Sequence, residues 1–269
     1  MRAASPWVPR LLIGLGVILT LLFIVAPVVV IFAQALAKGW DVYRANITHP
    51  DTLHAVWLTV LTAVIVVPVN LVFGIAAAWA ITKHRFPGKK LLLTAIEIPF
   101  SISPIVAGVT YILLYGASGL FGGLLQAWDV QVMFAVPAIV LVTLFVTSPF
   151  VARELIPLME AQGSESEEAA VTLGAGGFQI FRRVTLPAIG WALLYGTILC
   201  TARAIGEFGA VSVVSGNIRG ETNTLPLHVE VLYHDYNAAG AFAAASTLTF
   251  IALVTLVLKA AIERRLARR

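Results

Sequence analysis

Charged residues are scarce in this sequence. Only 12% of its residues are Asp, Glu, Lys or Arg, whereas 59% are hydrophobic. Soluble globular domains carry about one quarter charged residues and about one half apolar residues. This scarcity of charge excludes an ordinary water-soluble domain, so we expect lipid to surround most of the chain.

Cysteine is nearly absent, and a nucleotide-binding loop is missing. The one cysteine, Cys200, lies in an apolar run, which excludes both a disulfide framework and a thiolate metal site. We expect it to be a small buried side chain. The segment FPGKK at residues 86–90 lacks the upstream glycine and the hydroxyl of a P-loop. We therefore expect no ATP to bind by that route and no cofactor in this chain.

Two further kinds of site are disfavoured by where the polar residues lie. The net charge of +4 would suit a nucleic-acid-binding protein, but such proteins cluster basic residues on a water-facing patch, and here they flank apolar runs. We expect no nucleic acid partner. A group formed by His228, Glu230, His234 and Asp235 could suggest a metal, yet its spacing does not gather ligands on one face. We expect no metal site.

Long apolar runs fill most of the chain. Six of them could cross a hydrocarbon layer as helices, which takes about 20 residues each. They lie near residues 11–36, 53–82, 91–116, 132–157, 188–215 and 240–262. The first run is too long for a cleaved secretory signal, and none alternates polar and apolar residues as barrel strands do. The sequence predicts an all-α polytopic membrane bundle of six transmembrane helices.

The basic residues predict the direction in which these helices run. With the N-terminus inside, 14 of the 18 Lys and Arg residues face the cytoplasm, and only Lys38, Arg44 and Arg219 face outward. Arg203 then lies within a span. Because basic residues are enriched in cytoplasmic loops, both termini and the segment between the fourth and fifth spans are expected to be cytoplasmic.

That segment, SESEEAAVTLGAGGFQIFRRVTLP at residues 164–187, interrupts the apolar runs with charges and glycines. It predicts a short helix over about 164–174, in which Ser164 caps the start, Glu167 completes a capping box and Gly174 supplies the left-handed stop. Phe178 and Phe181 follow as an aromatic pair one turn apart.

A family resemblance rests on residues in this segment. The spacing of the motif resembles the EAA loop of the permease subunits of bacterial ABC importers, in which a coupling helix docks into a groove on the ATP-hydrolysing subunit. The motif residues are Glu168, Ala169, Ala170, Gly174, Val184, Leu186 and Pro187. The family prefers isoleucine where this chain has Val184. The resemblance implies that Glu168, Ala169, Ala170, Gly174, Leu186 and Pro187 couple the chain to an ATPase.

Other segments extend the resemblance over nearly the whole chain. The stretch TARAIGEFGAVSVVSGNIRGETNTLPL at residues 201–227 is similar to the sulfate and molybdate permeases, in particular to the W-type subunits of sulfate/thiosulfate importers. This implies an N-terminal segment with the first transmembrane helix (1–52), a type-1 transmembrane domain (53–262) and a basic cytoplasmic tail (263–269).

The same resemblance implies a set of partners and a location. The partners are a T-type sulfate permease, two ATP-binding subunits that hold ATP and Mg, and a periplasmic sulfate/thiosulfate-binding protein. The location is the bacterial inner membrane. Which anion is carried stays open among sulfate, thiosulfate and molybdate.

Ionisable residues inside the fifth predicted span suggest a translocation pathway. Arg203 and Glu207 are four residues apart and would share one helix face. Such residues are costly in a membrane and often functional, so Arg203, Gly206 and Glu207 are pathway candidates. The alternative is that the pair only neutralises itself and holds the helix.

Two other classes of function remain open at this point. An ion-coupled secondary transporter could use Arg203 and Glu207. A membrane-embedded enzyme could use residues 228–235, although these residues provide no recognisable nucleophile and base.

Overall fold

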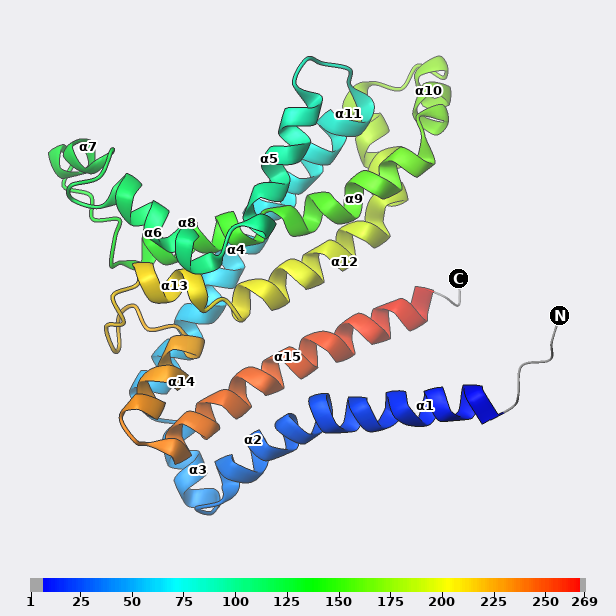
Figure 1. The fold of residues 1–269 in the computed structure, drawn as a ribbon. Coiled ribbons are helices and arrows are strands. Elements are labelled where there is room, and N and C mark those ends of the chain that lie inside the picture. Colours follow the sequence, from blue (N-terminus) through cyan, green and yellow to red (C-terminus); the bar gives the residue numbers. More distant parts are fainter. Residues whose placement is uncertain (1–6, 267–269) are drawn as a thin grey trace.

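The computed structural model describes residues 7–266, and this part of the chain is helical with no strand (Figure 1). The helices, including two π-helical turns (η), are α1 (Trp7–Thr20), η1 (Leu21–Val25), α2 (Ala26–Leu36), α3 (Trp40–Ile47), α4 (Pro50–Lys83), α5 (Lys89–Ser101), α6 (Pro104–Tyr115), α7 (Gly122–Ala127), α8 (Val136–Thr147), α9 (Pro149–Gln162), α10 (Glu165–Thr172), α11 (Gly177–Ile180), η2 (Phe181–Thr185), α12 (Leu186–Ile205), α13 (Gly209–Val214), α14 (Leu225–His234) and α15 (Ala238–Leu266). The predicted all-α class is confirmed.

Five helical runs are long and apolar enough to cross a membrane. They are Pro9–Leu36, Pro50–Lys83, Val136–Gln162, Gly177–Ile205 and Ala238–Val257. The predicted span at 91–116 is instead a bent pair, α5 and α6, whose axes differ by 110°. Pro104 opens α6 and holds Ser103 in an extended conformation, because a residue before proline is disfavoured in the helical region. Five of the six predicted spans therefore correspond to continuous helical runs, and the sixth corresponds to a bent pair that is either a broken span or a re-entrant loop.

The fifth predicted span also differs from a single helix over 188–215. Its helical run begins earlier, at Gly177, and ends at Ile205. Gly206 follows as the C-cap, and the short α13 starts only at Gly209. Two glycines within four residues explain the break, since glycine disfavours a helix interior by about 1 kcal/mol.

Two prolines are accommodated without such a break. Pro27 and Pro187 each follow a π-helical turn, in which the N–H of Ala26 bonds the carbonyl of Leu21 and the N–H of Leu186 bonds that of Phe181. The wider turn changes the hydrogen-bond register just before a residue that has no N–H to donate. Pro187 therefore lies inside the fifth helical run rather than at its start.

The core around which the other elements pack is formed by α4, α9 and α12. Gly74 and Gly196 let α4 and α12 approach α9 closely: a Cβ added at Gly74 would lie 2.6 Å from the Cβ of Val151. Asn70 donates to Thr147 Oγ1 (2.7 Å) and joins α4 to α8. Small residues and buried polar pairs of this kind hold membrane helices together. Cys200 is fully buried in this core, as predicted.

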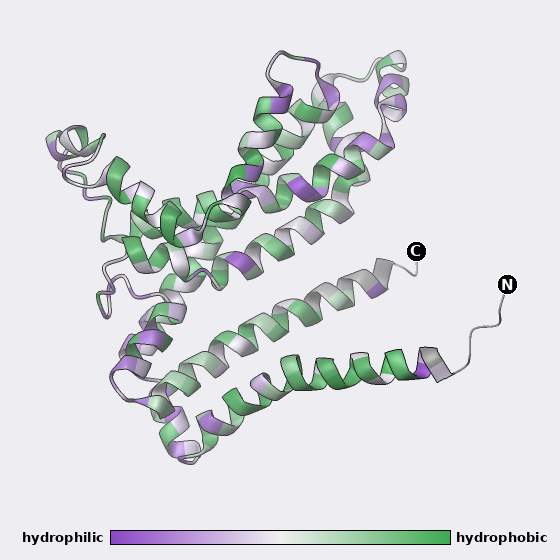
Figure 2. Cartoon of the chain, in the orientation of Figure 1, coloured by the Kyte–Doolittle hydropathy of each residue, from purple (hydrophilic) through white to green (hydrophobic). Residues whose placement is uncertain are grey.

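The elements gather at two ends of the bundle (Figure 1). The start of α1, the end of α15 and the start of α12 lie at one side, and α3 and α14 lie at the other. The helix α1 is hydrophobic along most of its length (Figure 2), and the most apolar 18 residues of the run Pro9–Leu36, to which it belongs, are unburied.

The predicted domain boundaries can be compared with these elements. The boundary at residues 52 and 53 falls in the first turn of α4. The last helix, α15, continues to Leu266, beyond the predicted start of the basic tail at residue 263, and residues 267–269 lie outside the described part of the chain.

Candidate functional site

The short helix predicted between the fourth and fifth spans is present as α10. It follows Ser164 and ends in a turn in which the N–H of Gly174 bonds the carbonyl of Val171 and the N–H of Ala175 bonds that of Ala170. Gly174 has φ +83°, a left-handed conformation that glycine adopts without the strain of a side chain. The paired bonds are those of a Schellman motif, so the helix is firmly terminated.

The start of α10 differs from the predicted capping box. The Ser164 side chain makes no cap to a backbone N–H and instead donates to Glu168 Oε1 (2.5 Å). The N–H groups of Glu167 and Glu168 bond the Ser164 carbonyl. The capping-box prediction is wrong because the Glu167 carboxylate is bound elsewhere.

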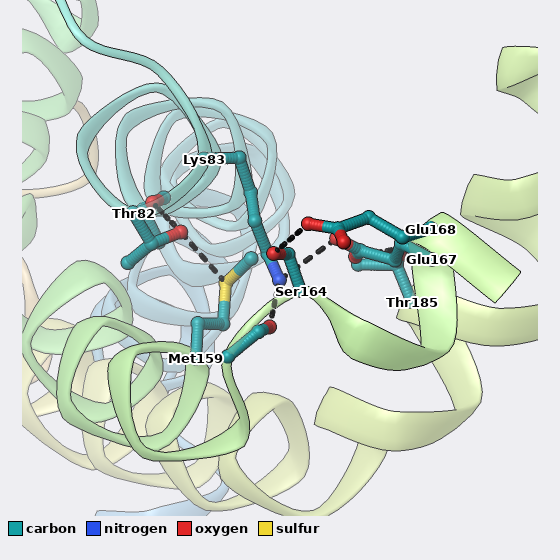
Figure 3. Close-up of polar contacts among 9 residues, drawn as sticks. Thr82, Lys83, Met159, Ser164, Glu167, Glu168 and Thr185 are labelled. Atoms are coloured by element: carbon teal, nitrogen blue, oxygen red, sulfur yellow. Dashed lines mark hydrogen bonds and ion pairs between the residues drawn. The ribbon is translucent and has the colours of Figure 1, made fainter. Parts of the chain in front are cut away.

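Glu167 connects α10 to two other elements (Figure 3). Its Oε2 lies 2.8 Å from Lys83 Nζ at the end of α4, and its Oε1 accepts a hydrogen bond from Thr185 in η2 (2.7 Å). Lys83 Nζ also donates to the carbonyl of Gly163. The side chains of Lys83 and Glu167 are 12% and 18% exposed, and Thr185 is buried.

Sequence reasoning assigned neither Lys83 nor Thr185 to this site. Lys83 was counted only among the cytoplasmic basic residues, and Glu167 only as a cap. A signal was available: Lys83 ends the second apolar run at the same predicted membrane face as the acidic cluster of residues 165–168. The sequence alone could not say which of those carboxylates it meets.

Most residues of the EAA motif lie on two separate helices. Glu168 and Ala169 are exposed and Ala170 is half-buried on α10, whereas Leu186 and Pro187 lie in the first turn of α12, beyond η2. Thr185, the residue before Leu186, is the one that touches α10 directly.

An apolar surface is exposed beside these polar contacts. Leu173 is 88% exposed, and Val171 and Phe178 are also exposed. Phe181 does not pair with Phe178 as predicted, because its ring stacks on Trp79 at 4.9 Å between centroids. Phe178 therefore joins the exposed surface while Phe181 packs inward.

The ion pair predicted in the fifth span is present, but its setting differs. Arg203 lies in the last turn of α12, whereas Glu207 lies beyond the end of that helix. Arg203 NH1 is 2.5 Å from Glu207 Oε2, and Glu207 Oε1 accepts the N–H of Ala210 (2.9 Å) at the start of α13. The expectation that the two residues share a continuous helix face is wrong, since the helix ends at Gly206.

The two partners of this pair differ in exposure. The Glu207 side chain is 1% exposed, and that of Arg203 is 31% exposed. Gly206 is exposed beside them. Glu207 thus neutralises Arg203 and accepts a hydrogen bond from the start of α13, while part of the Arg203 side chain stays exposed.

The polar residues 228–235 have separate partners. His228 is buried and its Nε2 lies 3.0 Å from Thr52 Oγ1, and burial lowers the pKa of His228. Asp235 pairs with Arg219. Within residues 7–266, no three His, Cys, Asp or Glu side chains are grouped so that they could hold a metal ion.

A family model accounts for most of the chain. The model of the binding-protein-dependent transport system inner membrane component matches residues 70–268. The chain belongs to this family. The membership identifies it as a transport component rather than an enzyme, so the membrane-embedded enzyme considered above is rejected.

Two sulfate permeases are similar to this chain over most of its length. The sulfate transport system permease protein CysW of Escherichia coli (strain K12) is 56% identical over 260 residues, covering 97% of this chain and 89% of that protein. The sulfate transport system permease protein CysT of Salmonella typhimurium (strain LT2) is 34% identical over 257 residues, covering 96% of this chain and 93% of that protein. The resemblance to W-type permeases is therefore confirmed.

A solved structure shares the fold. A chain of the bacterial alginate ABC transporter, crystallised in complex with an alginate-pentasaccharide-bound periplasmic protein, has a TM-score of 0.80 and 16% identity and covers 97% of this chain and 95% of its own length. The architecture is thus that of an ABC importer permease.

Proposed function

We propose that this chain is the W-type permease subunit of an ATP-driven importer of sulfate and thiosulfate in a bacterial inner membrane. The observation that carries the proposal is the 56% identity to a sulfate permease over 97% of the chain. Oxyanions such as molybdate are the nearest alternative cargo.

Sulfate uptake needs an external source of energy. Moving a dianion into an inside-negative cell costs about 4.6 kcal/mol per 100 mV, twice the value for one charge, before any concentration gradient. This chain has no P-loop in its sequence, so two ATP-binding partner subunits, which hold ATP and Mg, would supply that energy.

The helix α10 is the proposed contact with an ATPase. It is short and terminated by the Schellman turn at Gly174, its motif residue Glu168 is exposed, and exposed Leu173 and Phe178 follow it closely in the chain. An exposed apolar patch with a polar rim is typical of a protein interface. Glu168, Ala169, Ala170, Gly174, Leu186 and Pro187 would form this coupling region.

The helix α1 supports a second membrane partner. The most apolar 18 residues of the run Pro9–Leu36, which includes α1, are not covered by other parts of this chain. A helix that is hydrophobic on all sides is expected to be covered by other protein or by lipid. We infer that a T-type permease completes the pathway, because the similarity to CysT shows that such chains share this family. A periplasmic sulfate/thiosulfate-binding protein would deliver the anion.

The direction of insertion follows from charge. Both termini and α10 would be cytoplasmic because that orientation puts most Lys and Arg residues inside. In this arrangement α3 and α14 would face the periplasm.

The pair at the end of α12 is the proposed pathway element. The Arg203 side chain is partly exposed near exposed Gly206, and Glu207 holds it from a buried site. A guanidinium presents several N–H donors suited to a tetrahedral oxyanion. Arg203 would offset the anion's charge as it passes.

Uptake of radiolabelled sulfate by vesicles that contain the complete importer tests this function. We expect Glu168→Lys and Gly174→Asp to abolish ATP-driven uptake while the bundle stays folded. Uptake by this chain alone, driven by an ion gradient, would instead show a secondary transporter. Competition by excess thiosulfate but not molybdate is the expected cargo pattern, and the reverse pattern would reassign the cargo.

A further inference from the structure

We infer that Lys83 and Glu167 are positioning residues that transmit movement of α10 to α4, so that the coupling helix drives the long helix directly. The inference rests on the proposed function of α10. Its basis is the contact of Glu167 with Lys83 and Thr185, which neither the EAA motif nor the comparisons assign (Figure 3).

The chain connections of α10 are poorly suited to transmit force. Gly163 precedes α10 with φ +66°, Gly174 follows it with φ +83°, and Gly176 comes just before α11. A Cβ added at any of these three glycines would meet no atom within 4 Å, so no neighbouring group packs against these positions. Because glycine is the least restricted residue, movement of α10 would be absorbed at both ends unless side chains hold it.

Packing beneath α10 does not provide that hold. A cavity of about 220 Å³ lies at its base, and its lining includes Lys83, Met159, Glu167 and Thr185. Every side chain of α10 is exposed or half-buried. The polar contacts of Glu167 therefore link α10 directly to α4 and η2.

The geometry of the link favours transmission. Both Glu167 oxygens are used, one by Lys83 and one by Thr185, and Lys83 also binds the carbonyl of Gly163, the joint before α10. These contacts thus fix α10 to α4, to η2 and to the segment at Gly163 that leads into α10. The helix α4 runs from Pro50 to Lys83 and packs on α9 and α12 in the core, so a displacement at Lys83 would reach the whole bundle.

Charge reversal and exchange in the complete importer test the inference. Lys83→Glu and Glu167→Lys are each expected to lower sulfate uptake per ATP hydrolysed by about fivefold or more, the lower range of coupling between two sites. The double exchange is expected to restore part of that ratio, because it re-forms the ion pair but not the hydrogen bond from position 83 to the carbonyl of Gly163. A structural role alone would lower the yield of assembled complex without changing the ratio.

Matched variants separate this inference from its premise. Lys90→Glu changes an exposed lysine in the next helix and is expected to leave the ratio unchanged. If the reversals prevent assembly, Lys83→Gln with Glu167→Gln removes both charges and is expected to uncouple an assembled complex. A normal ratio in the reversals, or in that neutral pair, overturns the inference. Gly174→Asp in the same assay tests α10 itself, and normal uptake there would overturn the proposed function instead.

Discussion

Two ion pairs in this molecule use the same chemistry for different ends. Lys83–Glu167 joins α4 to α10, two elements far apart in the sequence, and both of its side chains are partly exposed, at 12% and 18%. Arg203–Glu207 spans only the end of one helix, and its carboxylate is almost fully buried. We therefore expect loss of the Arg203–Glu207 pair to reduce the free energy of unfolding most, and loss of the Lys83–Glu167 pair to reduce transport per ATP hydrolysed most.

The largest stability effect is expected at the local pair. Arg203→Ala leaves the buried Glu207 carboxylate without its partner, and breaking a buried pair in this way costs about 3–5 kcal/mol. Thermal unfolding of the purified complex measures the loss. Arg203→Ala combined with Glu207→Gln should recover most of it, since glutamine is neutral and keeps an oxygen for the N–H of Ala210. Equal instability of both variants would contradict this explanation. If the stable double variant then fails to import sulfate, the guanidinium acts in the pathway.

A smaller stability effect is expected at Gly174, on the coupling side of the comparison. A β-branched residue at φ +83° is strained by about 1–2 kcal/mol, because its Cβ crowds its own backbone in this conformation. No other atom lies within 4 Å of an added Cβ, so no steric clash with a neighbour adds to this cost. Gly174→Val should therefore lower the unfolding temperature more than Gly174→Asn, since asparagine tolerates this conformation. Equal losses in unfolding temperature would show that backbone strain is not the cause.

The long-range pair should cost still less. Glu167→Gln is expected to reduce the unfolding free energy by about 1 kcal/mol, the upper end for exposed ion pairs, because both side chains are partly buried while Lys83 keeps its bond to the Gly163 carbonyl. The same change should reduce coupling. Chemical unfolding of the variant complex provides the value. A loss as large as that of Arg203→Ala would remove the contrast between the two pairs.

The smallest effect concerns His228, a buried group on α14. Its pKa is lowered by burial, so the unfolded chain takes up a proton first as the pH falls below about 6.5. Stability is therefore full above that pH and falls below it, until the pH reaches the folded pKa. Unfolding temperatures at pH about 7.5 and about 5.5 should differ less in His228→Gln than in the parent. An equal pH dependence would assign it to other groups.

Features that depend on local residue order could be predicted from the sequence. The apolar runs gave the spans, Gly174 gave the end of α10, and the four-residue spacing gave the Arg203–Glu207 pair. The spans depend on solubility in lipid and the end of α10 depends on helix geometry, whereas the ion pair forms across the end of α12, between residues that are simply close in sequence.

Features that depend on competing partners could not be predicted. Glu167 has the right spacing for a capping box, but Lys83 and Thr185 bind its carboxylate instead. The bend between α5 and α6 and the break at Gly206 have local causes, at Pro104 and at two nearby glycines, but neither residue type alone says that a helix will bend or stop, since Pro68 lies inside the continuous α4. Hydropathy detects that a segment is apolar and does not detect that it changes direction.

Site-specific photocrosslinking from Leu173 tests the central claim most directly. Leu173 is 88% exposed on the proposed docking surface, and a photoreactive residue there should crosslink to an ATP-binding subunit in the assembled importer. The same residue at exposed Tyr236, after α14, should not. Crosslinking of position 173 to the periplasmic binding protein, or to no ATP-binding subunit in an active complex, would contradict the account.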